Sequence, residues 1–191
     1  MPRPRSFDEA DVLAKARDAF WLNGYTATSI SDLERATGLS RTSLYQAFGD
    51  KRQLYGRVLA AYREEGHARV RRMLAAAPDL RAAVRGLLSF AVASARDDQA
   101  RDGVCRGCLI ANATVELSTA DAEVAAFVAD NRARVVEMLT PLVKRDERPS
   151  TSPQQVGDFV YAVYTGIHAL AKSGASPEEL DDVIEGALRA L

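Results

Sequence analysis

Residues 24–54 read GYTATSISDLERATGLSRTSLYQAFGDKRQL, and they carry the most specific structural signals of the chain. Ser29 followed by Asp32 is a helix start signal, and Gly38 can end the short helix that they open. Ser40 can cap a second short helix directly after the turn. Two short helices joined by a tight turn that contains glycine predict a helix-turn-helix.

The second of these helices opens with Arg41, Thr42 and Ser43. The N-terminal end of such a helix meets base edges when it lies in a major groove. Arginine is a natural bidentate partner of guanine, while Thr and Ser hydroxyls contact phosphates or bases. The sequence therefore predicts that these three residues contact double-stranded DNA.

The rest of the chain also shows helical periodicity, and no segment alternates with period two for long enough to be a strand. Apolar residues recur at helical spacing over residues 8–22, 50–76, 80–95, 108–117, 121–142, 156–171 and 177–191. With the two short helices, this predicts an all-α fold of about nine helices. We expect a polar stretch over residues 96–107 and a disordered loop over residues 144–153. We expect a DNA-binding domain over residues 1–52 and a regulatory and dimerisation domain over residues 53–191.

Composition and charge narrow the class of protein. The chain has 191 residues, of which 47% are hydrophobic and 27% charged, as in ordinary globular proteins. No apolar run approaches the roughly 20 residues of a membrane span, and nothing resembles a signal peptide, so we expect a cytoplasmic protein. Residues 1–76 hold 13 Lys and Arg and 9 Asp and Glu, a net charge of +4. Residues 77–191 hold 12 and 17, a net charge of −5, which suggests that only the first part meets phosphates.

The pattern over residues 24–33, 36–40 and 43–51, followed by Leu54, resembles the DNA-binding domain of TetR/AcrR-type transcriptional regulators. Residues 172–191 also resemble the last helix pair of that family. The resemblance implies base contacts for Arg41, Thr42 and Ser43. It implies phosphate contacts for Thr28, Ser29, Tyr45 and Lys51. Ser31 stands where some relatives carry a longer side chain that contacts bases.

The last two predicted helices are dense in apolar residues. Two such helices from each of two chains would form a four-helix interface, and a dimer would suit an approximately palindromic operator. The alternative is that these residues form only the core of a monomer. The predicted interface residues are Val160, Val163, Ile167, Leu170, Leu180, Ile184 and Leu188.

Polar and aromatic residues on otherwise apolar helices are candidates for a small-molecule cavity. Plain core packing is the alternative interpretation of each one. The candidates are Phe90, Cys108, Asn112, Glu116, Phe127, Asn131, Tyr161, Tyr164 and His168.

Cys105 and Cys108 form a C-x-x-C motif, which in other proteins serves redox or metal chemistry. The chain has only two cysteines and two histidines, and a zinc site within one chain would need all four to converge, so we expect no zinc site. We also expect no cofactor. No hydrolase, Walker, metalloprotease or dinucleotide motif is present, so we expect no enzyme. The favoured hypothesis is a ligand-responsive regulator, most simply a repressor, released from its operator by an unknown small molecule. The alternatives are a thiol-based sensor on the same scaffold and a helical enzyme or carrier with an incidental helix-turn-helix.

Overall fold

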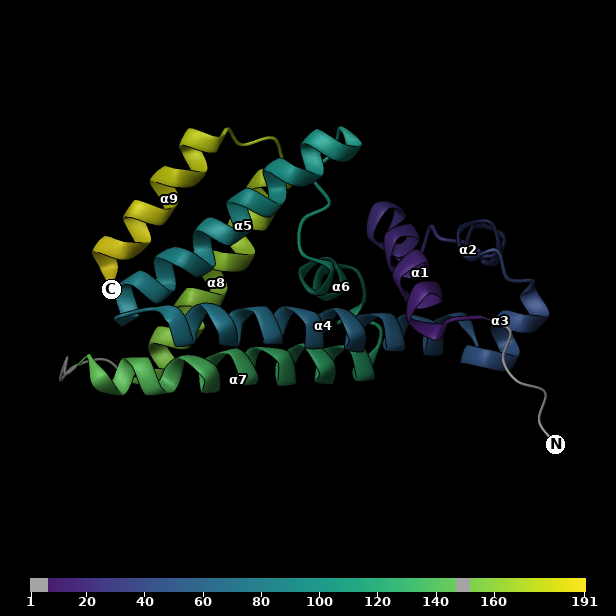
Figure 1. The fold of residues 1–191 in the computed structure, drawn as a ribbon, viewed down its shortest axis with the longest axis horizontal. Coiled ribbons are helices and arrows are strands. Elements are labelled where there is room, and N and C mark those ends of the chain that lie inside the picture. The colour runs from purple at the N-terminus through teal and green to yellow at the C-terminus, as the bar shows by residue number, and fades with distance from the viewer. Residues whose placement is uncertain (1–6, 147–151) are drawn as a thin grey trace.

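The computed structural model describes residues 7–146 and 152–191. Within these ranges the chain is all-α and contains no strand, which confirms the predicted fold class (Figure 1). None of the described helices combines the length and the apolar character that a membrane crossing demands. The nine described helices are α1 (Glu9–Asn23), α2 (Ile30–Thr37), α3 (Arg41–Phe48), α4 (Lys51–Ala76), α5 (Leu80–Asp102), α6 (Leu109–Leu117), α7 (Ala122–Arg145), α8 (Pro153–Lys172) and α9 (Pro177–Ala190).

Short local signals set the helix boundaries. Ser29 and Asp32 form a reciprocal capping box at the start of α2, and Ser176 and Glu179 form another at the start of α9. Gly38 ends α2 in the left-handed conformation at φ 74°, which a glycine adopts without steric cost. These contacts lie within four residues of one another, which is why the sequence predicts them.

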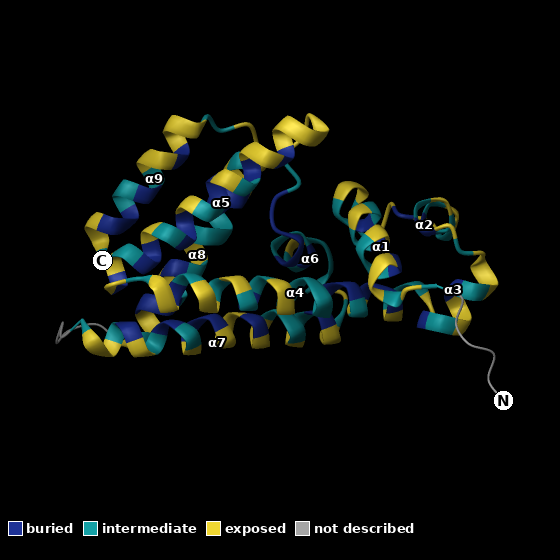
Figure 2. Ribbon diagram, in the orientation of Figure 1, coloured by how far each residue is buried: buried dark blue, intermediate teal, exposed yellow. Residues whose placement is uncertain are grey.

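The apolar residues gather into two cores. The first holds α1 to α3 against the start of α4 and includes α6; Phe20, Leu33 and Leu44 lie at its centre. The second lies between α5, α7, α8 and α9 and is centred on Leu139 and Ile167. Figure 2 shows the buried residues on the facing sides of these helices. Helix α4 runs alongside α7 and reaches from the first core to the second (Figure 1).

The polar stretch expected over residues 96–107 is largely helical, because α5 continues to Asp102. Asp98 explains the difference: its side chain is buried and accepts hydrogen bonds from Arg101 Nη2 at 2.9 Å and from Arg106 N at 3.1 Å. These partners satisfy the carboxylate inside the protein, although it lies in a stretch that the sequence marks as polar. The predicted loop over residues 144–153 falls partly on residues 147–151, which lie outside the described residues.

Candidate nucleic-acid interface and ligand cavity

The turn between α2 and α3 is fixed from inside. The Thr37 hydroxyl, which is buried, donates to Leu33 O at 2.6 Å and accepts from Leu39 N at 3.3 Å. Leu33 and Leu44 anchor the two helices in the first core, with exposed fractions of 0% and 3%. The opposite face of α3 is therefore held in a fixed position toward solvent.

That outer face of α3 carries the residues predicted to meet bases. Arg41, Thr42 and Tyr45 are exposed, and the guanidinium of Arg41 lies 5.7 Å from the centre of the Tyr45 ring. Ser43 is partly buried, and its hydroxyl lies 3.0 Å from the Ser40 hydroxyl. The face thus presents one guanidinium, a phenol and several hydroxyls on a single short helix.

The residues predicted to flank this face lie at two helix starts. Ser29 and Ser31 are exposed at the beginning of α2. Lys51 is the first residue of α4, and its ammonium lies 4.3 Å from the centre of the Tyr25 ring. DNA phosphates on one side of α3 would therefore meet the Lys51 ammonium, and phosphates on the other side would meet the exposed serine hydroxyls of α2.

Thr28 differs from the other predicted DNA contacts. Its side chain is fully buried, and its hydroxyl donates to Gly24 O at 2.6 Å. In this arrangement Thr28 closes the turn between α1 and α2 and points away from the outer surface.

Two polar links join the helix-turn-helix to the larger domain. The Glu116 carboxylate at the end of α6 accepts from Tyr25 N at 3.0 Å and from Thr26 N at 2.7 Å. Burial raises the pKa of Glu116, but these hydrogen bonds outweigh burial and leave it below its usual range. At the start of α4, Arg52 makes a bidentate pair with Asp121 at 2.6 and 2.7 Å, and this pair holds the pKa of Asp121 at about 2.

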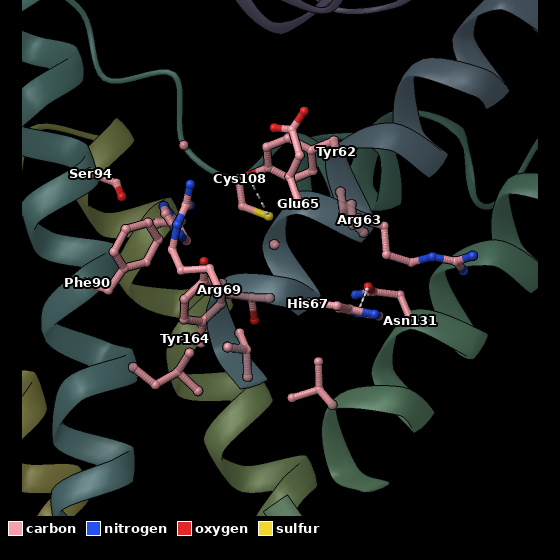
Figure 3. A pocket seen from close by; sticks show the side chains of 18 of the residues that line it. Tyr62, Arg63, Glu65, His67, Arg69, Phe90, Ser94, Cys108, Asn131 and Tyr164 are labelled. Atoms are coloured by element: carbon pink, nitrogen blue, oxygen red, sulfur yellow. Dashed lines mark hydrogen bonds between the residues drawn. The ribbon is translucent and has the colours of Figure 1, made fainter. Parts of the chain in front are cut away.

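A cavity of about 420 Å³ lies between α1, α4, α5, α7, α8 and the segment that enters α6 (Figure 3). Its volume is within the range of small-molecule sites in proteins. Six of the predicted pocket residues line it: Phe90, Cys108, Asn131, Tyr161, Tyr164 and His168.

The other three candidates lie outside this cavity. Asn112 donates to Arg106 O and accepts from Lys172 Nζ, and it does not line the cavity. Phe127 lies under the Arg63 guanidinium at 4.4 Å. Glu116 faces the helix-turn-helix, as described above, so its carboxylate links domains and does not contact the cavity.

The cavity wall contains a chain of hydrogen bonds. His67 Nε2 lies 2.9 Å from Asn131 Oδ1 (Figure 3). Asn131 Nδ2 donates to the Tyr161 hydroxyl at 3.3 Å. Burial lowers the pKa of His67. Burial also lowers the pKa of His168, to about 4, and neither ring nitrogen of His168 has a partner among the described residues.

Sequence reasoning missed much of the wall that α4 and α1 supply. Tyr62, Gly66, Arg69 and Met73 line the cavity at spacings of three and four residues, which place them on one face of α4. Trp21 of α1 completes this side, with its indole N–H donating to Gly107 O at 3.1 Å. The sequence does contain a signal for this wall, because α4 carries aromatic and basic residues on one face. The same helix also packs against both cores, so its residue pattern does not show which face lines a cavity.

The cysteines lie at the entry to α6. Cys108 is buried and accepts a hydrogen bond from the Tyr62 hydroxyl at 3.8 Å, whereas Cys105 is half-buried. Burial raises the pKa of both thiols. No group of three or more His, Cys, Asp or Glu side chains suited to a metal occurs in the described part of the chain.

Most of the predicted dimer contacts belong to the core of the single chain. Val163 is partly buried, while Leu170 is 43% exposed. The outer face of α8 is an apolar stripe of Phe159, Ala162, Gly166, Ala169 and Leu170, which we call the α8 stripe. The five predicted residues that are buried within the chain, at 0–3% exposed, are Val160, Ile167, Leu180, Ile184 and Leu188.

Comparisons with known proteins agree with this architecture. The profile of the family described as "Bacterial regulatory proteins, tetR family" matches residues 12–58. A solved structure of CifR, a TetR-family regulator in a cysteine-substituted form bound to 26-bp double-strand operator DNA, superposes with a TM-score of 0.84. It is 31% identical and is matched over 98% of this chain and 99% of that one. The chain belongs to the TetR family of transcriptional regulators.

Curated relatives point the same way. The HTH-type transcriptional repressor ComR of Escherichia coli strain K12 is 29% identical over 192 residues, covering 98% of this chain and 90% of the relative. The uncharacterized HTH-type transcriptional regulator YezE of Bacillus subtilis strain 168 is 33% identical over 127 residues. That match spans 66% of this chain and 63% of the relative. These relatives are named as regulators and not as enzymes.

Proposed function

We propose that this regulator is a homodimeric repressor that binds an approximately palindromic operator and is released by a small molecule in the cavity. The observation that carries the proposal is the pairing of an exposed α3 face with a cavity whose wall continues, through α6, to the helix-turn-helix. CifR, similar over its whole length, is described with operator DNA bound. We keep residues 1–52 as the DNA-binding domain and residues 53–191 as the regulatory and dimerisation domain.

In this proposal α3 lies in the major groove. Arg41, Thr42 and Ser43 contact bases, because they occupy the N-terminal end of the recognition helix. Tyr45 and Lys51 contact phosphates with an exposed phenol and an ammonium. Ser29 and Ser31 meet the backbone at the start of α2, while Thr28 supports their position from inside the turn.

The dimer in this proposal forms through the α8 stripe together with the outer side of α9. An exposed row of apolar and small residues lets two helices approach closely, and Gly166 has open space where a side chain would begin. Leu170 is the predicted interface residue that this face presents, while Val163 is partly buried against the second core. Two recognition helices in such a dimer reach half-sites about one helical turn apart, roughly 34–36 Å.

Release follows from coupling between the cavity and the two domain links. Cys108 and Ile110 line the cavity at the start of α6, and Glu116 holds the helix-turn-helix near its end. A ligand that favours a different position of α6 would favour a different separation of the two recognition helices. The population then shifts toward dimers that fit the operator poorly.

The experiment is operator binding measured by fluorescence anisotropy, on a site selected from genomic fragments with the purified dimer. Arg41→Ala should cost about 1–3 kcal/mol and relax preference at one base position. Lys51→Ala should weaken binding to all sequences and lower the salt slope by about one ion per subunit. Arg72→Ala, on an exposed side of α4 outside both the helix-turn-helix and the proposed interface, is the matched control. Binding that is indifferent to sequence in the wild-type protein would refute the repressor proposal.

A second candidate function is a thiol-based sensor on the same DNA-binding scaffold. The observation in its favour is that Cys108 lines the cavity and begins α6, the helix that reaches the helix-turn-helix. Mild peroxide should then abolish operator binding, dithiothreitol should restore it, and Cys108→Ser should remove the effect. Because burial raises the pKa of the Cys108 thiol, its reaction should be slow at neutral pH. Operator binding that survives peroxide would exclude this function.

A further inference from the structure

The charged and polar groups of the cavity wall divide into those with partners and those without. Glu65 is paired with Arg17 at 2.9 Å, and Asp98 with Arg101 at 2.9 Å. Asp97 also lines the cavity, but its side chain is exposed. The acidic groups are therefore neutralised or solvated, and they offer little to a cationic ligand.

Arg69 is the basic group of the wall that lacks an acidic partner in the described ranges. Its guanidinium lies 4.6 Å from the centre of the Phe90 ring, and the structure gives it no ion pair there. The other three arginines of the wall, Arg17, Arg63 and Arg101, are each paired with a carboxylate. In Figure 3 the Arg69 side chain extends from α4 toward Phe90 on α5.

Two further polar groups of the wall have no partner within the described chain. His168 is 4% exposed, and both of its ring nitrogens are without a hydrogen bond. The Tyr164 hydroxyl likewise makes none, and its ring packs edge-on against the His168 ring at 4.8 Å. A buried polar group without a partner is costly, so a ligand that completes its hydrogen bonds gains free energy from doing so.

Arg69 and Tyr164 both line the cavity, and Figure 3 shows both side chains near Phe90. Burial raises the pKa of Tyr164, and the positive charge of Arg69 opposes that rise. Both groups are hydrogen-bond donors, and two donors that converge favour an acceptor that carries negative charge.

The remainder of the wall is apolar and aromatic. Trp21, Phe90, Tyr161 and Tyr164 supply ring faces and edges, and aliphatic side chains fill the space between them. Aromatic rings pack well against such surfaces in offset or edge-on geometry. The aliphatic lining residues are Val70, Met73, Leu87, Ile110 and Val135.

We propose that the cavity binds an aromatic monocarboxylic acid, with its ring among these side chains and its carboxylate accepting hydrogen bonds from Arg69 and Tyr164. The proposal rests on the ligand-responsive function above and names the chemical class of its ligand. A cation would lie beside the unpaired charge of Arg69, and a wholly apolar molecule would leave Arg69, Tyr164 and His168 without partners. An organic anion with an aromatic body satisfies both parts of the wall.

The test is isothermal titration of the full-length dimer with two ligands of the same shape, 2-naphthoate and its neutral amide, 2-naphthamide. The wild-type protein should bind the carboxylate at least tenfold more tightly than the amide. Arg69→Gln should weaken naphthoate binding at least tenfold and leave naphthamide binding within threefold. The control is Arg72→Gln, because Arg72 is exposed on the same helix and does not line the cavity. It should change neither affinity.

Several outcomes would overturn the proposal. These are the absence of naphthoate binding at millimolar concentration, equal affinities for the two ligands, and an equal loss of both ligands in Arg69→Gln. Because the titration needs no DNA, its result is separate from that of the repressor proposal. Naphthoate binding without any change in operator affinity would support the ligand class and refute ligand-driven release. Operator release by neutral aromatics, with no preference for a carboxylate, would support ligand-driven release and refute the proposed ligand class.

Discussion

Replacement of Glu116 by glutamine tests the link between the cavity domain and the helix-turn-helix. The carboxylate accepts two backbone hydrogen bonds, from Tyr25 N at 3.0 Å and Thr26 N at 2.7 Å. A glutamine keeps the length of the side chain, but its amide oxygen replaces only one acceptor. Its NH₂ group then faces the second backbone N–H, which also donates, so one of the two bonds is lost.

The size of the effect follows from the environment of the two donors. Hydrogen bonds to a charged group contribute about 1.5–3 kcal/mol each. Thr26 is exposed and regains water, whereas Tyr25 is partly buried, so the net loss should be about 2 kcal/mol. At about 1.36 kcal/mol per factor of ten, this corresponds to roughly a 30-fold change in the opening equilibrium.

Amide hydrogen exchange followed by NMR measures this opening at a single residue. Exchange at Tyr25 should rise about 30-fold in Glu116→Gln, because the loss of about 2 kcal/mol favours the open state. Exchange at Val160, in the second core, should stay unchanged. Glu137→Gln, which removes an exposed charge on α7, is the matched control. Exchange at Tyr25 within threefold of wild type would show that the carboxylate does not hold the turn.

Three further predictions test packing, assembly and pH dependence. Gly157→Ala places a Cβ atom 2.8 Å from Val136 Cγ2 and should lower the free energy of unfolding by about 1–3 kcal/mol in urea titrations, whereas Gly56→Ala, in open space, should not. Leu170→Asp should yield folded monomers of 20.7 kDa in sedimentation, since this side chain is exposed in the single chain; persistent dimers would remove the α8 stripe from the interface. Burial lowers the pKa of His168 from 6.5 to about 4. Between pH 6.5 and pH 4, the imidazole is therefore protonated in the unfolded chain but neutral in the folded chain. His168 should therefore lower the stability by up to about 3 kcal/mol as the pH drops from 6.5 to 4, and His168→Gln should make urea midpoints measured across this range depend less steeply on pH.

The parts of the fold that the sequence predicts are those set by neighbours in the chain. The capping residues Ser29 and Ser176 act within three positions of themselves, and the turn at Gly38 needs only a residue that tolerates positive φ. The predicted end of α5 was wrong because it depends on a contact with a residue outside the helix. The Asp98 carboxylate accepts a hydrogen bond from the backbone N–H of Arg106, which lies eight residues away and beyond the end of the helix. No local sequence pattern predicts that contact.

The candidate cavity could be predicted only in part. Tyr161, Tyr164 and His168 interrupt an apolar helix, which is a visible signal. Arg69 and His67 lie on α4, where charged residues recur on every side of the helix. In such a helix, the sequence predicts that a charged side chain is exposed to solvent. Their roles depend on α5 and α7 packing against α4, which is a tertiary event that the spacing within one helix does not encode.

The dimer prediction shows a different limit. Helix α8 is apolar on two faces, because one side packs on α5, α7 and α9 while the other remains open. Ile167 and Leu170 are three residues apart and equally apolar, yet one is fully buried in the chain and the other is 43% exposed. Periodicity identifies both faces but cannot say which of them the chain itself covers.

Helix α6 gives the proposed coupling its physical basis. It is nine residues long, with Ile110 in the cavity wall and Glu116 on the helix-turn-helix. Six residues of helix span only about 9 Å, a distance over which a helix moves as a rigid rod. A ligand that displaces Ile110 therefore displaces Glu116 as well, and Tyr25 and Thr26 must follow or lose their acceptor. The Arg52 pair with Asp121 holds the start of α4 to the start of α7. In the proposed release, we therefore expect the helix-turn-helix to rotate about that contact.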